Sequence, residues 1–151
     1  MQAAIGCEQL KKFPRFIQKR RENWDRIRTG LEPYSDKILL PEAAENSVPS
    51  WFGFLITIRP ETGIDRNHVT ACIEQHNIQT RLLFSGNIIR HPCFDEYRDT
   101  DRYRVVGKLD VTDTVMQHTF WVGVYPGMTG QMADYMIKII GEALQKGEKE
   151  C

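Results

Sequence analysis

The sequence has no net charge, no long apolar run and no signal peptide. Its 20 basic and 20 acidic residues give a formal net charge of zero over 151 residues, so no global field attracts nucleic acid or an anionic membrane. No run approaches the roughly 20 apolar residues of a membrane span, and the N-terminus lacks an uninterrupted apolar core. We therefore expect one cytoplasmic domain with neither a nucleic-acid nor a membrane partner.

The cysteines form no metal-binding pattern. There is no CxxC pair and no histidine at zinc-finger spacing, so neither a zinc site nor an iron–sulfur ligand run is indicated. Free thiols are the expectation for a chain in a reducing compartment. The four are Cys7, Cys72, Cys93 and Cys151.

Motifs of self-sufficient catalysis are also missing. The chain has no GxSxG elbow, no glycine-rich phosphate loop, no HExxH and no carboxylates clustered near a histidine. We therefore predict no catalytic residue, no cofactor-binding residue and no metal ligand in this chain.

A long helical element is present over residues 1–31. Its apolar residues recur near a spacing of 3.6, which predicts one buried face, and the basic residues between them are predicted to form a solvated face. Pro14 has no amide proton to donate, so we expect two helices, or one sharply kinked helix, with the joint near Lys12. The apolar residues are Phe13, Phe16, Ile17, Trp24, Ile27 and Leu31.

Strand and helix signals alternate over residues 32–145. Asp65 and Asp110 are predicted to cap helices at their N-termini, Thr129 to cap the last helix, and Asn77 to end a helix in a left-handed conformation. The pattern predicts an α+β domain with a sheet of three to four strands whose two faces both need cover, followed by a frayed tail at 146–151. Strands are predicted at 50–58, 78–84 and 120–126, with a short extended piece at 103–109.

The stretch TRLLFSGNIIRHP, from Thr80 to Pro92, carries the best candidate site. Paired N–H donors of arginine match phosphate oxygens, and an amide and an imidazole lie near a glycine turn. The alternative is structural: Arg81 pairs with a carboxylate, and the Ser-Gly-Asn turn is selected for its backbone angles. The candidate substrate-binding residues are Arg81, Ser85, Gly86, Asn87, Arg90 and His91.

Three blocks together resemble one known family. They are MQAAIGCEQLKKF at the start, HNIQTRLLFSGNIIRHPCF in the middle and TFWVGVYPGMT near the end. The chain resembles the C-terminal third of the DegT/DnrJ/EryC1/StrS aminotransferase-like family. Within it, the chain is most similar to the CDP-4-keto-6-deoxy-D-glucose-3-dehydrase group of lipopolysaccharide 3,6-dideoxyhexose biosynthesis.

The resemblance implies the small C-terminal domain of a fold-type I pyridoxal-phosphate enzyme. Residues 1–31 match the helix that leaves the large domain, and 32–145 match the small domain that closes over substrate at a homodimer interface. The large domain has no counterpart here, including its pyridoxal or pyridoxamine phosphate site, its active-site lysine or histidine and any iron–sulfur ligands. Met1 falls where the family's chain is continuous, so three alternatives stay open: a true start, an internal methionine at the boundary of an excised domain, and a broken reading frame.

Three functions follow as expectations. The first is an inactive small domain of a nucleotide-sugar 3-dehydrase that positions substrate and closes the site. The second is the same domain of a sugar aminotransferase. The third is a non-catalytic interaction module that uses the surface the large domain would cover.

Overall fold

The chain forms a four-stranded antiparallel sheet preceded by a long helix. The computed structural model describes residues 2–146, and the strand order is β1-β2-β4-β3. No helix among these residues is both long and apolar enough to cross a membrane. The elements are α1 (Gln2–Leu31), β1 (Ile38–Leu39), β2 (Gly53–Ile58), α2 (Arg66–Gln75), β3 (Thr80–Leu82), α3 (Asp110–His118), β4 (Thr119–Gly123) and α4 (Gly130–Lys146), with short 3-10 turns at Glu32–Tyr34, Pro60–Thr62, Ile88–Arg90 and Pro92–Tyr97.

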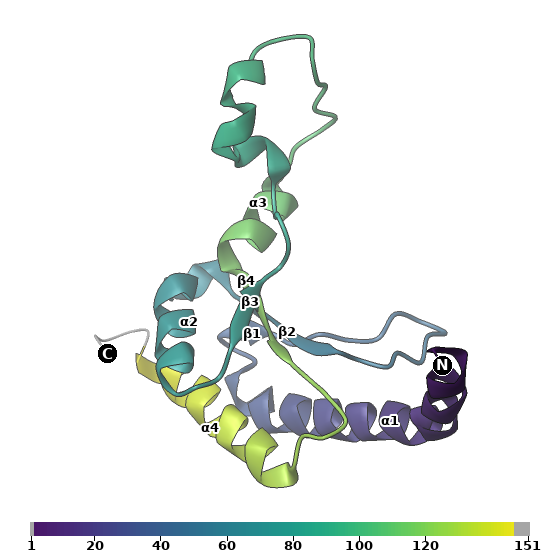
Figure 1. The fold of residues 1–151 in the computed structure, drawn as a ribbon. Helices are drawn as coiled ribbons and strands as arrows, with labels where there is room; N and C mark the ends of the chain where they lie inside the picture. The colour runs from purple at the N-terminus through teal and green to yellow at the C-terminus, as the bar shows by residue number, and fades with distance from the viewer. Residues whose placement is uncertain (1, 147–151) are drawn as a thin grey trace.

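Helix α1 is one continuous helix with Pro14 inside it. Figure 1 shows its first turns at a sharp angle to the remainder, which agrees with the predicted kink and excludes two separate helices. Trp24, Ile27 and Leu31 are buried against the sheet and α4, as predicted. Phe13 is instead 54% exposed, because the N-terminal half of α1 extends beyond the sheet, so the prediction of one buried face holds only for the C-terminal half.

Helices cover one face of the sheet. Phe54, Ile56 and Ile58 of β2 are fully buried on that face, where α1, α2 and α4 pack. On the opposite face the alternate residues, such as Leu55 and Trp121, stay partly exposed. The described residues therefore cover only one of the two faces that were predicted to need cover, and the open face is available for contact.

Local capping signals are mostly confirmed. The Asp65 carboxylate accepts from the Asn67 amide at 3.0 Å, Asn77 has a left-handed φ of 60°, and the Thr129 hydroxyl accepts from the Met132 amide at 3.2 Å. Asp110 does not act as a cap: Leu109 occupies that position and no side chain caps the helix. Helix α3 therefore begins one residue earlier than predicted.

The strand predicted at 78–84 is shortened to Thr80–Leu82. Phe84 takes a left-handed φ of 49°, so the chain leaves the sheet there and both Leu82 and Phe84 are exposed rather than in the core. Residues 83–109, here called the arm, project from the sheet and return through α3 (Figure 1). The extended piece predicted at 103–109 forms no ladder with the sheet.

The cysteines agree with the sequence prediction only in part. Cys7 and Cys93 are free and exposed. Cys72 is buried in the core and is not a free thiol, so the prediction is wrong there. Cys151 and the tail predicted to fray beyond Lys146 lie outside the described residues.

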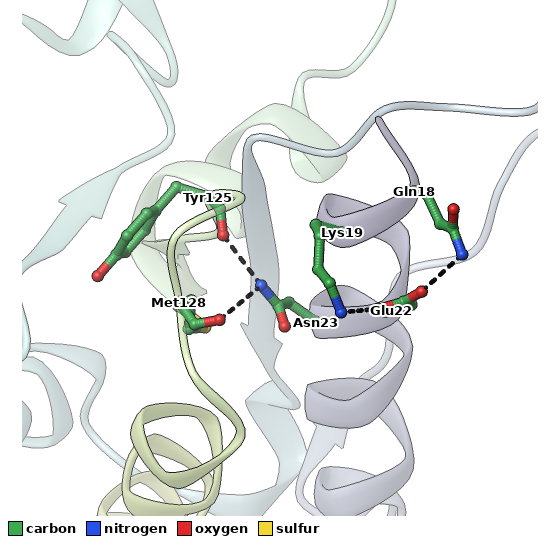
Figure 2. A network of polar contacts seen from close by, with 6 residues as sticks. All are labelled: Gln18, Lys19, Glu22, Asn23, Tyr125 and Met128. Atoms are coloured by element: carbon green, nitrogen blue, oxygen red, sulfur yellow. Dashed lines mark hydrogen bonds and ion pairs between the residues drawn. The ribbon is translucent and has the colours of Figure 1, made fainter. Parts of the chain in front are cut away.

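A buried amide joins α1 to the loop between β4 and α4. Asn23 is 7% exposed, and its Nδ2 donates to the carbonyl of Tyr125 at 2.9 Å and to that of Met128 at 3.3 Å (Figure 2). One turn away on the same helix, Gln18 and Lys19 donate to the exposed Glu22. Burial makes the Asn23 bonds costly to lose, whereas water replaces the bonds to Glu22.

We predict that Asn23→Ala destabilises the protein by about 1–3 kcal/mol, because the Tyr125 and Met128 carbonyls each lose a buried donor. Urea unfolding followed by circular dichroism measures the change. The matched control is Gln18→Ala, which removes an exposed amide bond from the same helix. Equal losses in the two variants would contradict a structural role for Asn23.

Candidate functional site

The structure divides the six predicted site residues into two groups. Arg81 lies on the edge strand β3 and is exposed. Ser85, Gly86, Asn87, Arg90 and His91 lie beyond it, at the base of the arm. The division follows from the left-handed turn at Phe84, which separates the strand from the rest of the motif.

Asp113 of α3 organises the base of the arm. Its carboxylate accepts from Asn87 Nδ2 at 2.6 Å, and from Arg90 Nε and Nη2 at 3.2 and 2.8 Å. Asn87 is 2% exposed, so its side-chain amide is bonded inside the fold and is not accessible to a ligand. The hydrogen bonds from Arg90 and, to a smaller extent, Asn87 lower the pKa of Asp113. In turn, the hydrogen bond to the Asp113 carboxylate raises the pKa of Arg90.

The remaining three residues form the turn that faces this cluster. Gly86 has a left-handed φ of 59°, and a Cβ there would lie 2.6 Å from the Met116 side chain, so only glycine fits. His91 Nε2 donates to the Ser85 carbonyl at 2.6 Å. These contacts match the structural alternative drawn from the sequence, except that Arg90, rather than Arg81, pairs with the carboxylate.

Arg81 is different because its guanidinium is uncommitted. Among residues 2–146 it has no hydrogen-bond or ion-pair partner. It borders a cavity of about 660 Å³ at the edge of β3. Of the six predicted residues, Arg81 alone combines an uncommitted donor group with a cavity in the described part of the chain.

The other residues of the cavity were not singled out from the sequence. Trp121 and Tyr125 come from β4 and the loop after it, and His76 from the end of α2. The aromatic residues in FWVGVYP were the available signal, but they predict a buried strand equally well. Their place beside Arg81 depends on strand register, in which Arg81 is paired with Trp121.

The cavity does not fit a pyridoxal phosphate. That cofactor needs a lysine for its Schiff base, or a base in its place, and a carboxylate or arginine at the pyridine nitrogen. No lysine of the described residues lines this cavity, so no Schiff base can form there. No aspartate or glutamate of these residues lines it either, and Arg81 is the one lining group of the described chain that suits a pyridine nitrogen. No chemical step through the cofactor is therefore assigned to these residues.

Comparison with known proteins identifies relatives along nearly the whole chain. A dTDP-4-dehydro-2,6-dideoxy-D-glucose 3-dehydratase of Saccharopolyspora spinosa is 47% identical over 146 residues, 97% of this chain and 30% of the relative. The lipopolysaccharide biosynthesis protein RfbH of Salmonella typhimurium is 43% identical over 137 residues, 91% of this chain and 30% of the relative. The chain thus spans about a third of these proteins, and the resemblance to sugar 3-dehydrases predicted from the sequence is confirmed.

Solved structures agree on the fold. The E. coli GDP-4-keto-6-deoxy-D-mannose-3-dehydratase with bound hydrated PLP is 27% identical, with a TM-score of 0.76 over 91% of this chain and 34% of that protein. The S. venezuelae DesV structure has a TM-score of 0.77 at 17% identity, covering 96% of this chain and 36% of DesV, and supports the fold alone. The predicted α+β small domain of a PLP-dependent transferase is confirmed. Because the family model matches residues 1–141, the chain belongs to the DegT/DnrJ/EryC1/StrS aminotransferase family.

Proposed function

We propose that this chain is the small domain of a nucleotide-sugar 3-dehydratase, and that it positions the substrate and helps to close the active site. The observation that carries the proposal is Arg81, an uncommitted guanidinium at the mouth of a cavity. A fork of N–H donors without an internal carboxylate suits a phosphate of a nucleotide-linked sugar. The identity to the S. spinosa 3-dehydratase supports the choice of reaction.

In this proposal the remaining predicted residues have a supporting role. Asn87 and Arg90 fix the arm to Asp113, and Ser85, Gly86 and His91 shape the turn between β3 and the arm. They position the polypeptide next to Arg81 rather than contacting the substrate through groups that are already bonded. A fixed wall of this kind reduces the entropy that must be lost when the substrate is oriented.

The catalytic chemistry belongs to a part of the enzyme that this chain does not contain. We propose a large domain that holds pyridoxal or pyridoxamine phosphate, in a cytoplasmic homodimer. When bound, that cofactor supplies the electron sink for loss of the 3-hydroxyl. The residues of this chain bind, orient and exclude water. An iron–sulfur cluster in the large domain stays an expectation of the resemblance.

Two alternatives have different signatures. An aminotransferase of the same family would have an in-frame large domain upstream with a lysine at the active-site position, whereas a dehydratase would have a histidine there. A stand-alone interaction module is favoured by exposed apolar residues, several of which lie on the arm, and it needs no upstream partner. These residues include Phe84, Ile88, Val105 and Val106.

A chimera tests the proposal. We expect that the S. spinosa 3-dehydratase, with its homologous third replaced by this chain, still consumes dTDP-4-dehydro-2,6-dideoxy-D-glucose. Arg81→Gln in that chimera should raise KM about tenfold with little change in kcat, because it removes binding common to the ground and transition states. Arg104→Gln, an exposed arginine of the arm, is the matched control. A folded but inactive chimera, or equal effects of the two variants, contradicts the proposal.

A second test concerns the supporting role of Asp113. Its folded-state pKa is lowered, so its contribution to stability is complete above the ordinary aspartate range and is lost as pH falls. The free-energy difference between the wild type and Asp113→Asn should therefore shrink from about pH 5 to about pH 3. Urea unfolding at several pH values measures it. Asp101→Asn, at an exposed position of the arm, is the matched control.

The isolated chain should be inactive. Pyridoxamine phosphate mixed with the 151-residue protein should give no protein-associated absorbance, because the cavity has no lysine or carboxylate to hold the cofactor. Gel filtration followed by an absorbance spectrum checks this, and the nucleotide-sugar should not be converted. Co-elution of the cofactor, or turnover, would show that the chain has a cofactor site of its own.

A further inference from the structure

The cavity beside Arg81 has the size and lining of a small-molecule site. Its volume of about 660 Å³ lies within the usual range for ligand pockets, about 300–1,000 Å³. Met128 and Met136, which are at least nine-tenths buried, contribute apolar surface. Tyr125 and Tyr135, each nearly half exposed, contribute aromatic surface at its border. Apolar surface dominates, and Arg81 adds a single positive charge.

Trp121 gives this cavity a fixed flat surface. A Cβ at Gly53 would lie 2.6 Å from its ring, so the indole packs directly against the backbone of β2. Phe52 meets the same ring edge-on, with centroids 5.4 Å apart and planes at 80°. A tryptophan held in this way offers a stacking surface at little entropic cost to an incoming planar ring.

Arg81 lies next to that surface. It is the register partner of Trp121 across β3 and β4, so both side chains are on the open face of the sheet. None of the described residues that line this cavity is acidic. Glu74 borders an adjacent hollow together with Arg81, but its carboxylate accepts from the Thr80 hydroxyl and forms no ion pair with Arg81. The pair therefore combines a stacking surface with an anion-binding fork, separated by one inter-strand distance.

His76 adds a directional group at the same cavity. A carbonyl only accepts, so the bond from Nδ1 to the Cys72 carbonyl places a proton on Nδ1. In the neutral imidazole, Nε2 is then an acceptor. The N–H of thymine or guanine is a donor, and therefore complements this nitrogen.

From these groups we infer that the cavity binds the nucleoside diphosphate part of the substrate. The base stacks on Trp121, and the diphosphate bonds to Arg81. The inference rests on the proposed function, because the cavity alone would suit other aromatic anions as well as a nucleotide. It deepens that function by assigning the nucleotide, rather than the sugar, to this domain. Because the site lies wholly within the chain, it should bind without the large domain.

The isolated 151-residue protein tests this directly. Thymidine diphosphate should bind with a dissociation constant of about 1 mM or tighter and should shift the indole N–H signal of Trp121 in an NMR titration. The stacked pair Trp24 and Trp51, which does not line this cavity, should not shift. GDP is the second probe, because relatives use either nucleotide. Inorganic pyrophosphate and thymidine, each lacking one half of the ligand, should bind at least about tenfold more weakly.

Variants separate the two halves of the site. Arg81→Gln should weaken binding of thymidine diphosphate about tenfold without lowering the unfolding midpoint, whereas the control Arg104→Gln should not weaken it. Trp121→Phe keeps an aromatic ring and should bind more tightly than Trp121→Leu. If Trp121→Leu fails to fold, the Arg81 pair still decides the outcome.

Several results would overturn the inference. They are no binding of either nucleotide, equal binding of pyrophosphate and thymidine diphosphate, or equal effects of the two arginine variants. An active chimera combined with a chain that does not bind nucleotide would remove this inference and leave the proposed function standing. If the chain binds nucleotide but the chimera is inactive, the proposed function is contradicted and the nucleotide site remains.

Discussion

The pairing of β3 with β4 is the constraint on which the candidate site depends. Only Thr80, Arg81 and Leu82 pair, against Val122, Trp121 and Phe120. This short register places Arg81 next to Trp121, on the face of the sheet that the described helices leave open. A slip of one residue would exchange the two faces of β3 and direct Arg81 toward the helices. The register thus fixes both the free cation and its aromatic neighbour.

The left-handed turn at Phe84 explains why two arginines of one motif have different surroundings. After Phe84 the chain leaves the sheet, and α3 returns beside the turn with Asp113 facing it. Arg90 forms a bidentate pair with that carboxylate, while Arg81, nine residues earlier, forms no ion pair with any described residue. A guanidinium bonded on two nitrogens has little left to offer a ligand. The two arginines therefore have different surroundings within a stretch of thirteen residues: Arg90 is bonded inside the fold, and Arg81 is exposed beside the cavity.

Local chemistry made much of the fold predictable. Asp65, Asn77 and Thr129 act over one helical turn, and each does what its short-range preference predicts. Errors arose where the outcome depends on distant parts of the chain. Nothing near Arg90 indicates Asp113, which is 23 residues away, and nothing near Phe84 indicates that the strand ends there. The two-residue strand β1 has too little pattern to be detected at all.

The large exposed apolar residues of the described chain include several on the two segments that project from the sheet and its helices: the first half of α1 and the arm. The body buries Phe54, Phe120 and Ile140 completely. By contrast, the first half of α1 exposes Leu10 and Phe13, and the arm exposes Phe84, Ile88 and Val106. Apolar groups on two separate projections cannot cover each other, so each needs a partner surface of its own or stays in water. A small domain that contacts a much larger one through both projections accounts for this distribution better than a module that binds through a single patch.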